Sequence, residues 1–147
     1  MALIEATSSF DIDNINLYRT TSLSSKWVFP SSGTPVHFQD NGMQTYGYWF
    51  DDALYVLYDY AGSSYELALG GNGLTWNGAN LTGGTVVAMA ELSIDFSGAT
   101  QTVWYARDFS LSATSFSAAR LSSSSADDYT LIPVSYTHLT LPTKRIV

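Results

Sequence analysis

Between residues 46 and 60 the sequence places acidic side chains among aromatic rings, a combination that could bind or cleave a sugar. A glycoside hydrolase needs two carboxylates beside the scissile bond, and aromatic rings would serve it as platforms for the sugar. The same acids could instead form a solvated turn between two strands whose rings pack together, and this is the simpler interpretation. The candidate carbohydrate-binding surface consists of Tyr46, Tyr48, Trp49, Tyr55, Asp51 and Asp52.

A hydrolase would also require two carboxylates that face one groove. The acids available for that role are Asp51, Asp52, Asp59 and Glu66. The sequence assigns none of them a catalytic role, and we expect the protein not to be an enzyme.

Metal and cofactor sites would depend on very few residues. The stretches 11–14 (DIDN) and 38–42 (FQDNG) offer oxygen ligands, but neither has the spacing of an EF-hand calcium loop. The chain contains no cysteine, so His37 would have to support a zinc site or a Ser-His-Asp triad almost alone. A haem site would need His37 and a tyrosine on opposite sides of an apolar slot. We expect a structural histidine and no cofactor in this part of the chain.

The charge balance limits the classes of partner. Thirteen acidic and six basic residues give a net charge of −7, and such a surface repels nucleic acid and anionic membranes. We predict no nucleic-acid binding and no membrane insertion, and we keep a cell surface or a polysaccharide as candidate partners. The N-terminus resembles no signal peptide, and no stretch reaches the roughly 18 apolar residues of a membrane span. The chain is therefore expected to be cytosolic, or exported by a route that does not read the N-terminus.

Runs of aromatic and β-branched residues, separated by joints rich in Gly and Asn, predict a mainly β protein. Strands with one inner and one outer face are typical of an antiparallel β-sandwich or meander rather than of a buried parallel sheet. The runs expected to form strands in the middle of the chain are 45–50, 53–60, 64–70, 73–76, 85–96 and 101–111.

Alternation predicts which side of two strands faces the core. In 53–60 the even-numbered residues, Leu, Val, Tyr and Tyr, form a wholly apolar or aromatic face. In 85–96 the even-numbered residues, from Val86 to Phe96, are the apolar set, whereas the odd-numbered set is mixed and includes Glu91. Both apolar sets are expected to point inward.

After Leu111 the composition becomes that of helices. The segment 112–121 (SATSFSAARL) is compatible with a helix. Farther on, Ser125 and Asp128 approximate a capping box, and acids are favourable at a helix N-terminus. We therefore expect one or two short helices near the C-terminal end.

The last fourteen residues, VSYTHLTLPTKRIV, differ from the rest of the chain. The stretch VSYTHLTLPT resembles, residue for residue, the translation of a transposase-type sequencing adapter, and KRIV fits the index region before the adapter's stop. We expect 133–147 to be an adapter-derived, non-native tail, which leaves His138 without a function. Four basic and 13 acidic residues then remain, a formal charge of −9. Residues 1–132 are expected to be a single β-rich domain and a fragment of a longer protein.

The segment 67–92 resembles a phrase found in N-terminal β-domains of haemolysin-type (RTX) calcium-binding proteins of alphaproteobacteria. That phrase is G-x-G-L-T-Y-x-x-x-G-x-L-T-G-G-T-V-T-x-I, and Trp76 stands where it usually has Tyr. The segment 109–132 is similar to the short helical region that precedes the calcium-binding nonapeptides of this family. The matching residues are Gly71, Gly73, Leu74, Thr75, Trp76, Leu81, Thr82, Gly83, Gly84, Thr85, Val86, Asp127, Asp128, Leu131 and Ile132.

The resemblance implies a non-enzymatic structural or adhesive module of a secreted or surface protein. It implies type I export guided by a C-terminal signal, hence an extracellular or cell-surface location. The family's calcium-binding repeats would lie downstream of Ile132, so calcium is expected there rather than in 1–132. The alternative is the carbohydrate-binding β-sandwich module that uses the exposed aromatics of the 46–60 hairpin.

Overall fold

The computed structural model describes most of the chain between Ile15 and Leu131, together with one N-terminal strand. The described residues are 3–6, 15–21, 25–28, 36–37, 49–50, 52–77, 80–124 and 126–131. Only the backbone is described for 3–6, 26–28, 36–37, 49–50, 52–53, 127 and 129–130.

The main sheet is an antiparallel meander, which confirms the predicted mainly β fold. Four long strands pair with their neighbours in the chain: β5 (Asp52–Tyr60), β6 (Ser63–Trp76), β7 (Leu81–Ile94) and β8 (Thr100–Arg107). Three short strands extend it: β2 (Lys26–Val28) on β5, β1 (Leu3–Ala6) on β8 and β9 (Leu111–Ser112) on β7. A separate pair consists of β3 (Val36–His37) and β4 (Trp49–Phe50).

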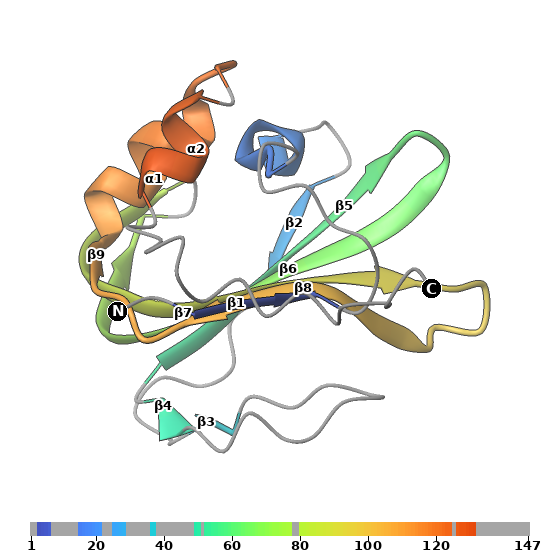
Figure 1. Cartoon of the computed structure of the whole chain (residues 1–147), viewed down its shortest axis with the longest axis horizontal. Coiled ribbons are helices and arrows are strands. Elements are labelled where there is room, and N and C mark those ends of the chain that lie inside the picture. Colours follow the sequence, from blue (N-terminus) through green and yellow to red (C-terminus); the bar gives the residue numbers. More distant parts are fainter. Residues whose placement is uncertain are drawn as a thin grey trace, which may run out of the picture.

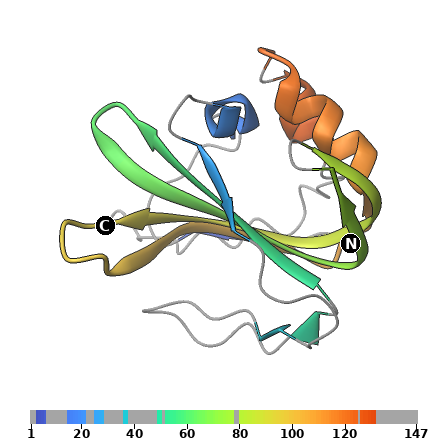
Figure 2. The ribbon, with the colours of Figure 1, turned by 180° about the vertical axis from the view of Figure 1, so that it is seen from behind.

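The helices lie on one side of this sheet. They are the 3-10 helix η2 (Leu17–Thr21) and the α-helices α1 (Ala113–Leu121) and α2 (Ala126–Leu131). Figure 1 shows all three above the twisted sheet, with β3 and β4 beyond its opposite face, and Figure 2 shows the same arrangement from behind. α1 begins where expected, because the Ser112 side chain accepts a hydrogen bond from the Ser115 amide. The two C-terminal helices agree with the expected one or two.

Buried polar contacts fix η2 against α1 and α2. The Asp128 carboxylate accepts a hydrogen bond of 2.9 Å from the Leu17 amide. Arg120 donates from Nε to Thr20 Oγ1 at 2.7 Å and from a terminal nitrogen to the Thr20 carbonyl at 2.9 Å. Thr20, Arg120 and Asp128 are all buried. We call these contacts the helix clamp. Asp128, expected as a capping residue, thus reaches across to another helix.

The two faces of the sheet carry different side chains. The cross-strand row Val56–Leu67–Glu91–Trp104 faces the helices, whereas the row Tyr55–Ala68–Ala90–Tyr105 faces the other way. Residues with bulky side chains from β5, β6, β8 and α1 form the core on the helix side. The second face is a smaller cluster rich in alanine, and it is also buried.

The predicted inner faces need two corrections. Leu54, Val56 and Tyr58 are buried as expected, but Tyr60 is 44% exposed because it lies at the end of β5 beside the turn. In β7 the apolar set does not stay on one face: a register shift beside Gly70 and Gly71 leaves Val87 as an extra residue. A β-bulge of this kind changes which face the following residues occupy.

As a consequence, Val86 and Met89 join the helix-side core, while Ala88 and Ala90 face the other way. Phe96, the last member of the predicted inner set, is fully exposed in the turn after β7.

Glycines allow the two strands of the long β6–β7 hairpin to approach each other closely. Gly84 has a φ of +91°, and a Cβ there would collide with the backbone of Gly73. A Cβ on Gly71 would collide with the carbonyl oxygen of Thr85. The two backbones therefore approach more closely than side chains permit, and this explains the Gly-rich sequence between residues 70 and 84.

We predict that Gly84→Ala destabilises the fold far more than Gly98→Ala. Gly98 has a similar φ of +84°, but a Cβ there would have no neighbour within 4 Å. The control substitution should cost only about 1 kcal/mol of left-handed strain, whereas Gly84→Ala adds a backbone clash and should cost about 3 kcal/mol or more. Urea unfolding measures both, and equal losses would contradict the close approach.

Candidate functional site

The residues predicted to bind carbohydrate are only partly described. Tyr46, Tyr48 and Asp51 lie outside the described residues, and Trp49 and Asp52 are described for their backbones, in β4 and β5. The ring of Tyr55 is half-buried on the alanine-rich face, where burial and the nearby Glu66 raise its pKa. The carbohydrate-binding surface around the 46–60 hairpin therefore stays a prediction.

The acids proposed for hydrolysis differ in how exposed they are. Asp59 is exposed and accepts a hydrogen bond of 2.7 Å from the Ser64 hydroxyl across the β5–β6 pair. Glu66 lies on the same face, opposite Leu57, and its burial raises the pKa of its carboxyl group. Asp51 is outside the described residues and Asp52 is described for its backbone. The hydrolase alternative thus stays a prediction too.

The possible metal ligands give no cluster in the described part of the chain. Within it, no group of three or more His, Cys, Asp or Glu residues could hold a metal ion. His37 pairs with Trp49 in the β3–β4 sheet and is described for its backbone. The stretches 11–14 and 38–42 lie outside the described residues. Among the helices described, none is both long enough and apolar enough to cross a membrane.

A half-buried acid that the sequence pattern assigned to the mixed face lies on the helix side of the sheet instead. Glu91 occupies β7 between Leu67 and Trp104 on the helix side of the sheet. The Tyr58 hydroxyl donates a hydrogen bond of 2.8 Å to Glu91 Oε2. Burial raises the pKa of Glu91, although the Tyr58 hydrogen bond and the positive charge of Arg19 act in the opposite direction. Burial and Glu91 together raise the pKa of Tyr58.

Arg19 in η2 reaches the same end of the sheet. Its guanidinium carbon lies 4.1 Å from the centroid of the Tyr60 ring, which is a cation–π contact. Its Nε is buried and has no hydrogen-bond partner among the described residues. Beside it, the rings of Tyr58 and Tyr65 stack with centroids 5.6 Å apart. We call Arg19, Tyr58, Tyr60, Tyr65 and Glu91 the tyrosine–arginine cluster.

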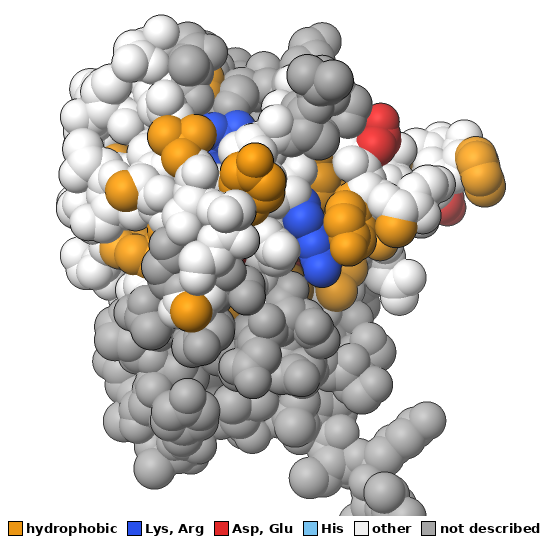
Figure 3. Space-filling model, turned by 90° about the horizontal axis from the view of Figure 1, so that it is seen from above, with side chains coloured by type: hydrophobic (Ala, Val, Ile, Leu, Met, Phe, Trp, Pro, Cys, Tyr) orange, Lys and Arg blue, Asp and Glu red, His pale blue; other side chains and the backbone are white. Residues whose placement is uncertain are grey.

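The cluster borders the outer surface of the helix side. Tyr60 is 44% exposed, and Tyr18, which precedes Arg19 in η2, is 46% exposed. Figure 3 views this side and shows basic side chains directly beside hydrophobic ones, on a protein whose net charge is negative. Arginine next to exposed tyrosine is typical of binding surfaces.

Sequence reasoning missed this cluster for identifiable reasons. The alternation of apolar residues in 53–60 places Tyr58 and Tyr60 on one face, so their neighbourhood can be inferred from the sequence. The inward position of Glu91 depends on the β7 bulge, which the pattern of apolar residues did not reveal. Arg19 reaches Tyr60 because the helix clamp fixes η2, a contact between distant parts of the chain.

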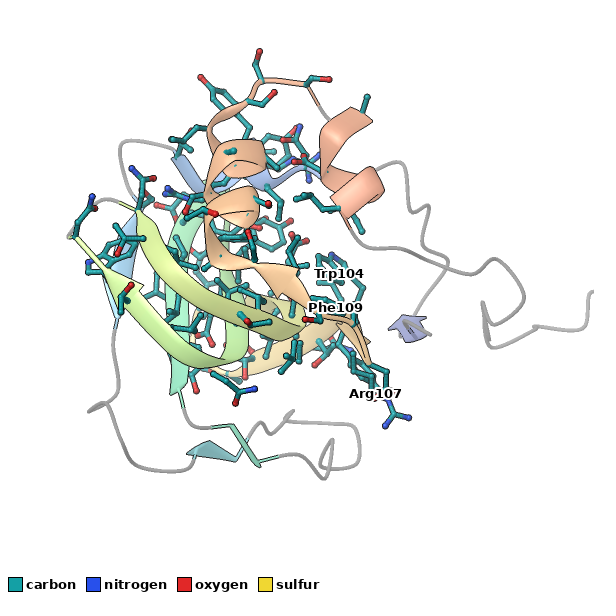
Figure 4. All side chains as sticks on the ribbon, turned by 90° about the vertical axis from the view of Figure 1, so that its left-hand side faces the viewer. Trp104, Arg107 and Phe109 are labelled. Atoms are coloured by element: carbon teal, nitrogen blue, oxygen red, sulfur yellow. The ribbon has the colours of Figure 1, made fainter. Side chains whose placement is uncertain are left out.

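A second arginine offers a contrast. Arg107 ends β8, and its Nε lies 3.8 Å from an Asp108 carboxylate oxygen. Figure 4 shows Arg107 pointing away from the body of the molecule, whereas Trp104 and Phe109 lie near the base of α1. Trp104 and Phe109 are buried in the core. Arg107 is thus a surface cation already paired with an acid, unlike Arg19.

No protein-family model matches this chain, and no curated protein or solved structure matches it.

We predict that Glu91→Gln stabilises the protein at neutral pH. Burial holds the folded-state pKa of Glu91 above its usual value of 4.5, so the folded state loses stability as pH rises through the interval between the unfolded and the folded pKa. Glutamine removes this penalty and can still accept the Tyr58 hydrogen bond. The gain in Tm should therefore be largest near pH 7 and should shrink as pH falls below about 4.5.

The control is Asp59→Asn, since Asp59 is exposed and the amide oxygen can still accept from Ser64. This variant should shift Tm little at either pH. A Glu91→Gln protein less stable than the native one at pH 7 would mean that Arg19 and Tyr58 outweigh the cost of burying the charge.

Proposed function

We propose that the chain is a non-enzymatic N-terminal module, structural or adhesive, of a secreted or surface bacterial protein of the RTX type. Its calcium-binding repeats would follow Ile132, and the tail 133–147 would be derived from adapter DNA. The location proposed is extracellular or on the cell surface, reached by type I export.

The observation that carries the proposal is the position of the glycines in the RTX-like phrase. The phrase coincides with β6 and β7, the longest hairpin of the sheet. Two of its matching residues, Gly71 and Gly84, stand where a Cβ would collide with the opposite backbone. The sequence similarity therefore falls on positions that the fold itself restricts, which supports a common β-domain over a chance match in composition.

The second similar segment, 109–132, also supports the proposal. It supplies Phe116 to the core and Arg120 and Asp128 to the helix clamp. A helix pair anchored in this way would give a following repeat array a fixed base. The acidic composition and the absence of cysteine agree with export of an unfolded chain into a calcium-rich medium.

We predict that the native gene, read without adapter sequence, continues after the codon for Ile132 into G-G-x-G-x-D repeats. Such repeats bind calcium through their aspartates in a parallel β-helix. Long-read sequencing of the source DNA measures this directly. A native stop codon at that position, or a downstream region without the repeats, would contradict the proposal.

Calcium titration of the native-length protein provides the matching control. The full protein should gain structure and bind calcium, while a version that ends at Ile132 should keep its Tm unchanged between EDTA and millimolar calcium. A large calcium-dependent rise in the Tm of the shorter version would place the calcium site in 1–132 and contradict this assignment.

A further inference from the structure

We propose that the tyrosine–arginine cluster binds a carboxylate-bearing sugar, the uronic acid unit of an acidic polysaccharide. The inference deepens the adhesive role and in that respect rests on the proposed function. The cluster shares no residue with the predicted carbohydrate-binding surface. Its Tyr58 and Tyr60 belong to β5, the strand that also contains Tyr55 of that surface.

Arg19 is an unpaired cation. Within the described residues it forms no ion pair, and its buried Nε has no acceptor. A buried donor of a charged group without a partner typically costs about 1–3 kcal/mol or more. A ligand cannot reach this buried Nε, but Arg19 as a whole is only half-buried. Because the two terminal nitrogens of a guanidinium present parallel N–H groups, the acceptor that fits best is a planar carboxylate bound by two hydrogen bonds.

The neighbouring acid, Glu91, forms no ion pair with Arg19. Glu91 is close enough for the charge of Arg19 to act on it, but its Oε2 accepts from the Tyr58 hydroxyl instead. Burial also favours the uncharged form of Glu91. Arg19 therefore keeps a positive charge available on a protein with a net charge of −7.

The aromatic ring next to Arg19 suits the rest of the ligand. Tyr60 is 44% exposed and its ring centroid lies 4.1 Å from the guanidinium carbon, while Tyr18, which precedes Arg19 in η2, is 46% exposed. The negative faces of aromatic rings attract the weakly positive C–H groups of a sugar ring, and their hydroxyls can bond to sugar hydroxyls. A carboxylate attached to a polyhydroxylated ring satisfies both features, whereas an inorganic anion satisfies only the guanidinium.

The site is also held in place before a ligand arrives. η2 is fixed by the helix clamp, and the guanidinium carbon of Arg19 already lies 4.1 Å from the centroid of the Tyr60 ring. The entropy of ordering the arginine is therefore largely lost on folding rather than on binding, which favours affinity.

The test is isothermal titration of the 147-residue chain with an oligogalacturonate and with the same oligomer after methyl esterification. The ester keeps the sugar rings and removes the negative charge. We expect the acid to bind roughly 10- to 100-fold more tightly than the ester, the range for hydrogen bonds to a charged group. Inorganic phosphate and polyglutamate, at equal charge concentration, should bind more weakly than the oligogalacturonate.

Three variants locate the site. Arg19→Gln should weaken binding of the oligogalacturonate by at least about tenfold, and Tyr60→Leu by several-fold because the ring and the cation–π contact are lost. The matched control is Arg107→Gln, which removes one positive charge that is already paired with Asp108 and should leave the affinity unchanged. Thermal unfolding confirms that each variant is folded, and Arg19→Lys, which keeps the charge without the planar fork, replaces Arg19→Gln if that variant unfolds.

Several results would overturn the inference. The first is that the native chain does not bind the oligogalacturonate, and the second is that Arg107→Gln loses as much affinity as Arg19→Gln. The third is that the ester binds as tightly as the acid. The fourth is that polyglutamate binds as tightly as the oligogalacturonate or more tightly, which would identify an acidic peptide as the ligand. The gene sequence downstream of Ile132 is independent of these titrations. If the gene encodes the repeats but the chain does not bind the oligogalacturonate, only the proposed sugar site is wrong. If the chain binds the oligogalacturonate but the gene lacks the repeats, only the RTX assignment is wrong.

Discussion

The position of η2 against the C-terminal helices depends on a hydrogen bond between residues 111 positions apart, from the Leu17 amide to the Asp128 carboxylate. Arg120 completes the same clamp by binding the side chain and the carbonyl of Thr20. Without these contacts a five-residue 3-10 helix has too few internal hydrogen bonds to persist. With them, η2 places Ile15 and Leu17 in the core and Arg19 against Tyr60.

The helix clamp has a desolvation cost, since both of its charged side chains, Arg120 and Asp128, are buried. Desolvation of a carboxylate or guanidinium is compensated only when hydrogen-bond partners are well placed. Here those partners include backbone groups of η2, which cannot be supplied unless η2 has its native geometry. The polar contacts therefore specify one arrangement of the N-terminal and C-terminal elements, and the apolar core between them provides the stability.

Much of the sheet could be predicted from sequence, because alternation and glycine-rich joints are local signals. The helices at 113–121 and 126–131 were equally visible. The bulge in β7 was not, because one extra residue reverses the facing of its neighbours while the apolar composition stays the same. For that reason Glu91 was assigned to the mixed face and its partner Tyr58 was not connected with it. Arg19 was unpredictable for a different reason: its position follows from a tertiary contact of η2.

Hydrogen exchange at the Leu17 amide tests the coupling between the two ends of the chain most directly. If the Asp128 carboxylate holds this amide, its exchange should be as slow as that of the central β7 amides, which require global unfolding. In an Asp128→Asn variant the exchange of Leu17 should accelerate at least about tenfold, because the charged acceptor is lost. A Leu17 amide that exchanges in the native protein as fast as an unprotected backbone amide would contradict the clamp and, with it, the placement of Arg19.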